Sequence, residues 1–440
     1  MSEHPNAAAL PGDPHDHPPG RPVIVDVTEL MAWQGPAVGI VRVVQEIAAR
    51  VLQDRPDALF IRYEHACEDL VPVSAQALRE RLARSDRVRR PPPRPEGRWP
   101  DRWRRLKARL CPAALLRARE RWRLRRARRR WPALDLPRHA PFIFAGFTDH
   151  PPRIARCAAL IDTLQLQPVF YCHDLIPLRL PNVVSTHTAT HFPRMIETFV
   201  RDGAVVLCNS RCTQADVAAW AAPRGVRLRQ LQTLILGFEV RTSADPRPSR
   251  PEVAALLGQD FLLYVSTIEK RKNHDVLYKA WLMLLERGVT DLPKLVFVGA
   301  EGWIIGDLMH DLRHDPRIRP HVVLLHQLPD EDLSLLYRHC LFTLYPSIYE
   351  GWGLPVSESL LNGKFCLASD QGSLPEAGAG LAEHLPPYDT RAWADRIEHH
   401  HRDRAGLRAI EARIRSDYTG RRWSTFSAEF MQQLRALDAG

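Results

Sequence analysis

Short apolar runs alternate with helical segments along most of this chain, and this alternation limits the folds that it can adopt. Nine runs are typical of buried strands: residues 22–27, 142–145, 168–171, 204–207, 261–265, 295–299, 322–325, 341–345 and 365–368. Apolar residues recur at helical spacing in segments between them, such as 40–51, 276–285 and 330–339. Apolar strands that alternate with helices are typical of parallel sheets covered on both faces. The sequence therefore predicts an α/β fold.

A segment dense in proline and serine divides this alternation into two series. Residues 243–251 have the composition of a linker, with three prolines and two serines. We therefore expect two doubly wound domains, one at residues 21–240 and one at 251–415. Ligands of such sheets bind beyond the carboxyl ends of the strands. With two domains, the expected site is the cleft between them.

Composition excludes several classes of protein. Hydrophobic residues make up 45% of the chain and charged residues 25%, which is the balance of an ordinary globular protein. Residues 1–20, rich in proline, histidine, aspartate and alanine, are predicted to be a disordered tail. The eight cysteines form no CxxC pair, which argues against zinc ribbons and thioredoxin-type chemistry. The absence of a signal peptide and of a membrane-spanning apolar stretch favours a reducing cytosol.

Positive charge is concentrated in one insertion, at residues 79–133. Its part from 79 to 130 holds 22 arginines and lysines against five acidic residues, whereas the rest of the chain has 39 basic and 46 acidic residues. Apolar residues repeat there at helical spacing: Trp99, Trp103, Leu106 and Leu110. Basic helices with tryptophan on one side suit an anionic membrane surface. A solvated insertion and a nucleic-acid-binding segment are the alternatives, and we favour the membrane.

Two carboxylates, Glu350 and Glu358, stand with seven residues between them. Gly351 and Gly353 allow the backbone to pass close to a ligand, and Pro355 suits the first turn of a helix that carries Glu358. The free amides at such a helix start favour a phosphate group. The alternative is that Glu358 only complements the helix dipole and that Glu350 is a surface acid.

Three adjacent cations, Lys270, Arg271 and Lys272, follow the first apolar run of the second series. Arginine binds phosphate through a fork of donors, and lysine acts as a point charge. Such a run is often a solvated turn. Its place at the carboxyl end of an expected strand favours a diphosphate site.

The segment Arg271-Lys272-Asn273, followed about 75 residues later by the Glu-x7-Glu element, resembles the family 4 retaining glycosyltransferases. The likeness covers most of the chain beyond Pro141, is densest between residues 261 and 376, and includes 39–42, 173–177 and 209–210. It implies the GT-B fold, in which two Rossmann-like domains face a cleft. It also implies that a final helix, within residues 418–440, crosses back to the first domain.

The resemblance implies roles for individual residues. Arg271 and Lys272 are similar to the pair that holds the donor diphosphate and neutralises the departing nucleotide. Glu350 is similar to the acid that faces the donor sugar, and Glu358 to the one that binds the ribose. His173 is similar to a histidine near the reacting sugar, although it could also serve only to hold its loop.

Further donor contacts follow from the same likeness: Gly39, Asn273, Gly351, Gly353 and Leu354. No metal and no cofactor are expected, because helix amides and cations do the work of Mg²⁺ in such enzymes and no clear DxD motif is present. One departure stands out. Many relatives carry a further arginine shortly before the Arg-Lys pair, where this chain has Ser266 and Thr267.

The function implied is a metal-independent, retaining hexosyltransferase. It would move a hexose from a nucleotide-diphosphate sugar to a hydroxyl of a lipid-linked or surface polysaccharide bound by the first domain. GDP-mannose is the first candidate donor, because residues 26–30 and 39–42 look like those of bacterial polysaccharide mannosyl- or rhamnosyltransferases. The expected location is cytoplasmic, peripheral on the inner face of the bacterial cytoplasmic membrane, without nucleic acid. The alternatives are a non-catalytic membrane or nucleic-acid adaptor on this scaffold, and a GT-B sugar-nucleotide epimerase.

Overall fold

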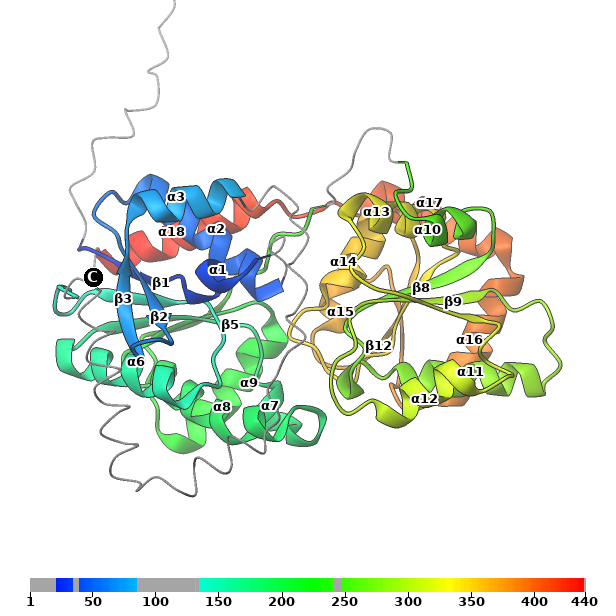
Figure 1. The fold of residues 1–440 in the computed structure, drawn as a ribbon, viewed down its shortest axis with the longest axis horizontal. Helices are drawn as coiled ribbons and strands as arrows, with labels where there is room; N and C mark the ends of the chain where they lie inside the picture. The colour runs from blue at the N-terminus through cyan, green and yellow to red at the C-terminus, as the bar shows by residue number, and fades with distance from the viewer. Residues whose placement is uncertain (1–20, 35–38, 85–130, 132–133, 240–246, 439–440) are drawn as a thin grey trace, which may run out of the picture.

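Two α/β domains, each built around one sheet with helices on both faces, lie side by side in the molecule (Figure 1). The computed structural model describes residues 21–34, 39–84, 131, 134–239 and 247–438. The first domain contains a sheet of seven strands and the second a sheet of six. The predicted α/β class with two doubly wound domains is confirmed.

The sheet of the first domain has the strand order β3-β2-β1-β4-β5-β6-β7, and β3 alone runs antiparallel to its neighbour. Its strands are β1 (Ile24–Asp26), β2 (Leu59–Glu64), β3 (Asp69–Val73), β4 (Pro141–Phe144), β5 (Gln167–Cys172), β6 (Val205–Cys208) and β7 (Gln230–Thr233). Strands β1, β4, β5 and β6 coincide with predicted apolar runs. The sequence did not indicate β2, β3 or β7, because these strands alternate buried and half-buried positions or are half-buried throughout.

Helices cover both faces of this sheet, and each face has its own apolar core. The helices of the first domain are α1 (Thr28–Ala32), α2 (Gly39–Asp54), α3 (Ala75–Arg84), α6 (Pro151–Leu164), α7 (Ile176–Arg179), α8 (Thr186–Phe199) and α9 (Arg211–Ala221), with short 3-10 turns at Pro181–Val183 and Ala222–Arg224. Helix α2 buries the apolar stripe that its sequence predicts, including Val43, Ile47 and Val51.

The second domain has the strand order β10-β9-β8-β11-β12-β13, and its paired strands are all parallel. Its strands are β8 (Phe261–Val265), β9 (Lys294–Val298), β10 (Val322–Leu325), β11 (Thr343–Tyr345), β12 (Cys366–Ser369) and β13 (Glu383–Leu385). The order reverses between β8 and β11. The loops that leave the carboxyl ends of these two neighbouring strands therefore diverge and open a crevice.

The helices of the second domain complete its two outer layers. They are α10 (Pro251–Leu256), α11 (His274–Glu286), α12 (Gly306–His314), α13 (Asp330–His339), α14 (Leu354–Leu361), α15 (Leu374–Ala377), α16 (Thr390–Arg402) and α17 (Arg404–Asp417), with a 3-10 turn at Lys270–Lys272. Helix α13 coincides with the predicted segment. Helix α14 begins one residue before Pro355, as the proline suggested.

The last helix, α18 (Trp423–Asp438), lies against α2 of the first domain (Figure 1). The ring of Phe426 meets that of Tyr171 edge to face, with 5.5 Å between centroids. The chain thus crosses between the domains twice, and the two crossings are paired: the amide of Phe238 donates to the carbonyl of Arg421 at 2.7 Å. Gly237 is required there, because a Cβ would lie 2.5 Å from the Cα of Trp423.

The carboxyl edges of the two sheets face each other, and apolar side chains join them. Ile176, Val183 and Val184 of the first domain pack with Ile348 and Tyr349 of the second. This contact fixes the loop after β11 against the first domain.

Hydrogen bonds support the same interface. The hydroxyl of Tyr349 donates to the Asp216 carboxylate at 2.7 Å. The carboxylate of Glu376 accepts the amides of Arg211 and Cys212, at 3.0 and 2.8 Å, and so caps the first turn of α9 from the other domain. Because a helix N-terminus carries partial positive charge, the charge of Glu376 also favours this contact.

Some expectations fall outside the described residues. These are the tail at 1–20, residues 243–246 of the linker, and the basic insertion apart from residues 79–84 and 131. Within the described part of the chain, no helix is long and apolar enough to cross a membrane. The seven cysteines that the structure describes are free thiols, and six of them are buried.

The packing of α18 can be tested with Phe426→Ala. Phe426 is fully buried, and we expect its loss to lower the free energy of unfolding by about 3–5 kcal/mol. Thr425→Ala, at an exposed position of the same helix, should change it by less than about 0.5 kcal/mol. Denaturant unfolding measures both. Equal, small effects would mean that α18 does not contribute to the core.

Candidate functional site

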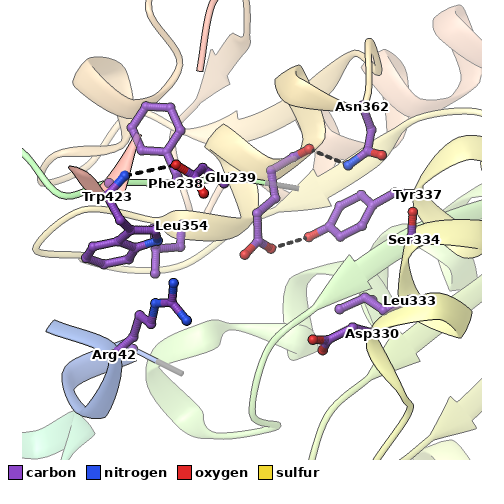
Figure 2. Close-up of a pocket in the computed structure, with 13 residues that line it drawn as sticks. Arg42, Phe238, Glu239, Asp330, Leu333, Ser334, Tyr337, Leu354, Asn362 and Trp423 are labelled. Carbon is purple, nitrogen blue, oxygen red and sulfur yellow. Dashed lines mark hydrogen bonds between the residues drawn. The ribbon is translucent and has the colours of Figure 1, made fainter. Parts of the chain in front are cut away.

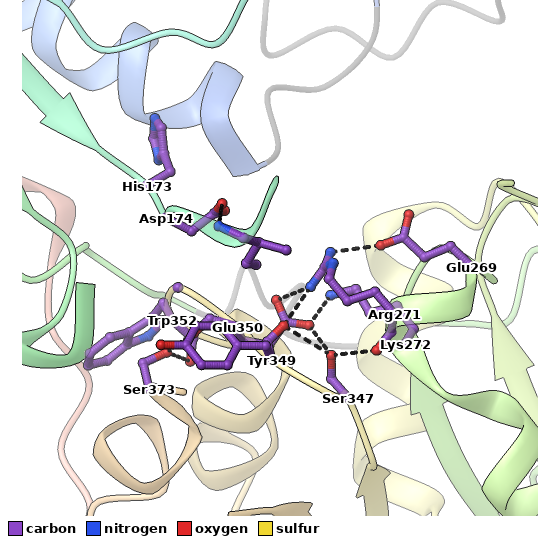
Figure 3. Close-up of polar contacts among 12 residues, drawn as sticks. His173, Asp174, Glu269, Arg271, Lys272, Ser347, Tyr349, Glu350, Trp352 and Ser373 are labelled. Carbon is purple, nitrogen blue, oxygen red and sulfur yellow. Dashed lines mark hydrogen bonds and ion pairs between the residues drawn. The ribbon is translucent and has the colours of Figure 1, made fainter. Parts of the chain in front are cut away.

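Two loops, one after β8 and one after β11, bring Arg271, Lys272 and Glu350 into contact (Figure 3). Arg271 Nη1 lies 2.7 Å from one carboxylate oxygen of Glu350, and Lys272 Nζ lies 2.5 Å from the other. The hydroxyl of Ser347 also donates to this carboxylate, at 2.6 Å. Residues nearly 80 positions apart in the chain thus form one buried ionic cluster at the point where the strand order reverses.

The charge of Glu350 is set by this cluster. Burial raises the pKa of its carboxyl, but the charges of Arg271 and Lys272 outweigh burial and hold the pKa at about 2. Burial and the charge of Arg271 lower the pKa of Lys272, while Glu350 opposes the change. A second acid, Glu269, pairs with Arg271 Nη2 at 2.7 Å. Both cations are therefore balanced by carboxylates before any ligand binds.

Asn273 joins the two loops that form the cluster. Its side-chain amide donates to the carbonyls of Pro346 and Pro387, at 3.1 and 2.6 Å, in a buried position. Its backbone is left-handed, with φ of 57°, where the 3-10 turn ends and α11 begins. Since both amide hydrogens are used within the protein, Asn273 fixes the Arg271 loop against the loop after β11. The contact of Asn273 with the donor stays a prediction.

The loop that holds His173 lies opposite, at the end of β5. The Nε2–H of His173 donates to the carbonyl of Ala145 at 2.7 Å. Burial lowers the pKa of His173 to about 4, so the ring is neutral at neutral pH and its Nδ1 is an acceptor. The carbonyl of His173 accepts from the Asn209 amide at 2.7 Å. This histidine therefore holds its loop, and its ring is available only as a neutral group.

Gly351 is one of the points at which the two domains touch. A Cβ at this position would lie 1.9 Å from the carbonyl oxygen of His173, so no other residue fits while the loops keep this spacing. Next to it, burial raises the pKa of Asp174, and the charge of Arg271 opposes the change. Figure 3 shows His173 and Asp174 above the cluster of Arg271 and Glu350.

Glu358 lies in a separate cavity of about 170 Å³ that both domains line (Figure 2). Its carboxylate accepts a hydrogen bond from the Tyr337 hydroxyl at 3.0 Å. Burial raises the pKa of Glu358, and this hydrogen bond opposes the change. The lining residues are Gly39, Arg42, Gly237, Phe238, Glu239, Asp330, Leu333, Ser334, Tyr337, Leu354, Glu358, Asn362 and Trp423.

Helix α14 starts at the border of this cavity. Gly353 precedes its first residue with φ of 101°, a conformation that L side chains rarely adopt. Leu354, the first residue of the helix, lines the cavity. The partial positive charge of the helix N-terminus is therefore next to Glu358. The loop between Glu350 and α14 connects the ionic cluster to the cavity.

The structure thus brings most of the predicted residues to one edge of the second domain. Arg271, Lys272 and Glu350 form the cluster, and Gly39, Leu354 and Glu358 line the cavity. Sequence reasoning missed Glu269 and Tyr337. Glu269 precedes the cations directly, which was a usable signal, whereas Tyr337 lies at an apolar position of α13 and gave none. Among the residues that the structure describes, no three His, Cys, Asp or Glu side chains are arranged to hold a metal ion.

A family model matches the second domain of this chain. Residues 247–420 match the family model described as "Glycosyl transferases group 1". A "serotype-specific mannosyltransferase WbdA" of Escherichia coli is 28% identical over 211 residues, which are 45% of this chain and 26% of that protein. "O-antigen chain mannosyltransferase B" of the same species is 36% identical over 128 residues, 29% of this chain and 33% of that one. The chain therefore matches only a quarter to a third of these relatives' length.

Solved structures match nearly the whole chain at lower identity. Anabaena HepE in complex with UDP-glucose aligns with a TM-score of 0.58 and 14% identity, covering 94% of this chain and all of that one. Sucrose-phosphate synthase from Thermosynechococcus elongatus aligns with a TM-score of 0.58 and 16% identity, covering 95% and 99%. Likeness at this level establishes the fold alone. The expected GT-B arrangement of two Rossmann-like domains is confirmed.

The ionic cluster predicts a pH-dependent effect of Glu350→Gln. Removing this charge leaves Arg271 and Lys272 buried without it, so the free energy of unfolding should fall by about 3–5 kcal/mol at pH 7. Because the pKa of Glu350 is depressed in the folded state, its stabilisation is complete above about pH 4.5 and is lost as the pH falls toward 2. The difference between variant and wild type should therefore stay constant from pH 8 to 5 and shrink below pH 4.5.

Denaturant unfolding at several pH values measures this difference. Glu252→Gln, at an exposed position of α10, serves as the control and should have little effect at any pH. A difference that shrinks already between pH 8 and 6 would contradict the assignment of a low pKa to Glu350.

Proposed function

We propose that this chain, whose residues 247–420 are a glycosyl transferases group 1 domain, is a glycosyltransferase that uses a nucleotide-diphosphate sugar. The match to that family model confirms the resemblance seen in the sequence. The observation that carries the proposal is the buried cluster of Arg271, Lys272 and Glu350 beside the cavity of Glu358. Together they offer positive charge for a diphosphate and a carboxylate for ribose hydroxyls. The names of the relatives favour mannose as the hexose and GDP-mannose as the donor.

Arg271 and Lys272 assist the departure of the diphosphate from the sugar. When the bond between sugar and diphosphate breaks, negative charge grows on the leaving phosphate, and groups already fixed near it stabilise that charge without reorganising. Arg271 and Lys272 are fixed in this way by Glu350 and Glu269. We propose that they replace a divalent metal here, so that the enzyme needs no metal and no cofactor.

Retention at the anomeric carbon is proposed to follow a front-side attack, in which the leaving diphosphate takes the proton of the acceptor hydroxyl. The state of Glu350 supports this route over a covalent intermediate on its carboxylate. Four groups, namely Arg271, Lys272, Ser347 and Tyr345, donate to this carboxylate, and its pKa is about 2. So weak a base is a poor nucleophile. The ring of His173 is neutral and is held by the carbonyl of Ala145, so it lines the cleft without adding a charge.

The acceptor is proposed to be a hydroxyl of a lipid-linked or surface polysaccharide bound by the first domain. The relatives named for O-antigen chains support a polysaccharide acceptor. The basic residues 79–130, of which the structure describes only the first few, support a location on the inner face of an anionic membrane. Nucleic acid is not proposed as a partner.

The proposal is tested by donor use. Purified protein is incubated with GDP-mannose, UDP-glucose or ADP-glucose, with and without a mannose-ended oligosaccharide, and nucleotide release and product linkage are measured. We expect acceptor-dependent release of GDP and a product with the α configuration of the donor sugar. A sugar nucleotide changed at one carbon would indicate an epimerase. Absence of release and of binding for all donors would indicate a non-catalytic adaptor.

The role of the cations is tested by Arg271→Ala and Lys272→Ala. Each should raise the activation free energy of transfer by about 2–4 kcal/mol, because each removes charge that stabilises the leaving diphosphate. Steady-state kinetics with the active donor measure kcat and KM. Lys270→Ala, an exposed cation in the same turn, should behave as wild type. Unchanged kinetics in both variants would remove the diphosphate assignment.

Membrane docking has its own test. Sedimentation with phosphatidylglycerol vesicles should show binding that weakens with salt without vanishing, since salt screens arginine but not tryptophan contacts. Trp99→Ser with Trp103→Ser should make the binding entirely salt-sensitive and leave the release of nucleotide from soluble substrates intact. If the wild type ignores both anionic and neutral vesicles at low salt, residues 79–130 are a solvated insertion.

A further inference from the structure

The cavity around Glu358 has an unusual balance of charge for a nucleotide site. Three carboxylates line it, those of Glu239, Asp330 and Glu358. Among its described lining residues, Arg42 is the one cation. A nucleoside diphosphate is an anion, and carboxylates within a few ångströms repel it. A cation at the border of this cavity therefore matters more than a surface charge would.

Arg42 reaches this cavity from the first domain, in the first turn of α2 and three residues after Gly39. Its Nη2 lies 2.7 Å from the carboxylate of Glu46, one turn further along the helix. Its guanidinium carbon lies 5.5 Å from the ring centroid of Trp423. The side chain is only 17% exposed. Glu46 and Trp423 thus fix the direction of the guanidinium, and it borders the cavity without depending on a ligand for its position.

The neighbours of Arg42 indicate which part of a ligand it meets. Figure 2 shows Arg42 and Leu354 on one side of the pocket, and Asp330 and Tyr337 on the other. Tyr337 is the residue whose hydroxyl donates to Glu358. Leu354 is the first residue of α14, and the partial positive charge at this helix start favours phosphate. A ribose whose hydroxyls meet Glu358 would then place its phosphate toward Leu354 and its base toward Asp330. The two parallel N–H groups of a guanidinium match two phosphate oxygens better than they match ribose hydroxyls.

We propose that Arg42 binds the phosphate nearest the ribose of the donor nucleotide, together with the first turn of α14. The inference rests on the proposed function, because it assumes a nucleotide in this cavity. It adds a donor-binding residue from the first domain to those of the second. The donor is then held by both domains, and its phosphate charge is shared between Arg42 and the cluster of Arg271 and Lys272.

The alternative is that Arg42 serves only to pack α2 against α18 through Glu46 and Trp423. The two roles differ in what they do to ligands with and without phosphate. A packing residue would affect GDP, GMP and guanosine alike, or none of them. A phosphate-binding residue affects GDP and GMP and spares guanosine.

The experiment compares the affinity of the full chain for GDP, GMP and guanosine by titration calorimetry, with UDP as a second probe. Arg42→Gln should weaken GDP and GMP binding by about tenfold or more and leave guanosine unchanged. Arg50→Gln is the matched control: Arg50 lies on the same helix, pairs with Asp54 at 2.8 Å with the same i, i+4 spacing, and does not line the cavity. It should bind all three ligands as the wild type does.

Arg42→Lys keeps a positive charge but lacks the paired N–H donors of the guanidinium. It tests the role of Arg42 if Arg42→Gln gives no folded protein, as judged by its thermal transition. It should weaken GDP and GMP several-fold and spare guanosine. Equal affinities of wild type and Arg42 variants for GDP would overturn the role of Arg42 and leave the proposed function standing. Equal losses for GDP and guanosine would also overturn it. If the wild type binds neither GDP nor UDP, the proposed function fails, and the role of Arg42 fails with it.

Discussion

The ionic cluster of Arg271, Lys272 and Glu350 is the interaction on which the rest of the site depends. Burying such charges is costly unless they are paired and hydrogen-bonded, and here each cation meets a carboxylate. The pairing requires the loops after β8 and β11 to approach closely. Asn273 enforces that approach through its two carbonyl contacts. The strand order, which reverses between these two strands, is what makes the approach possible.

The site also requires that the first domain contact the loop after β11, which carries Glu350. Tyr349, directly before Glu350, meets Asp216 in the first domain, and Gly351, directly after it, leaves no space beneath the carbonyl of His173. The acid of the cluster is thus held on both sides by contacts between domains. Glu376 adds a contact of a different kind, since it completes the first turn of a helix that belongs to the other domain. The geometry of the site therefore depends on how the two domains are arranged.

Sequence reasoning predicted the features that depend on local pattern. Nine strands and the start of α14 near Pro355 follow from apolar runs and turn residues. It failed for β2, β3 and β7, whose half-buried positions include polar residues. It also failed for the side chain of Asn273, whose partners lie 73 and 114 residues away. It missed the pairing of Glu269 with Arg271, although Glu269 directly precedes the cations. It could not find the ring of residues around Glu358, because that ring depends on how separate elements meet in space.

The paired crossings at Phe238 and Arg421 have a mechanical consequence. Two connections far apart would limit rotation of one domain against the other. Here the two connections are joined by a hydrogen bond, so they lie along a single line. This line alone does not fix the angle between the domains, so the angle depends on the contacts of Tyr349, Gly351 and Glu376 with the first domain. Helix α18 begins two residues after Arg421 and moves with the first domain, so the axis lies at the base of Trp423 and beside the cavity of Glu358. A turn about this axis must break those contacts, so the angle between the domains and the position of the loop that carries Glu350 change together.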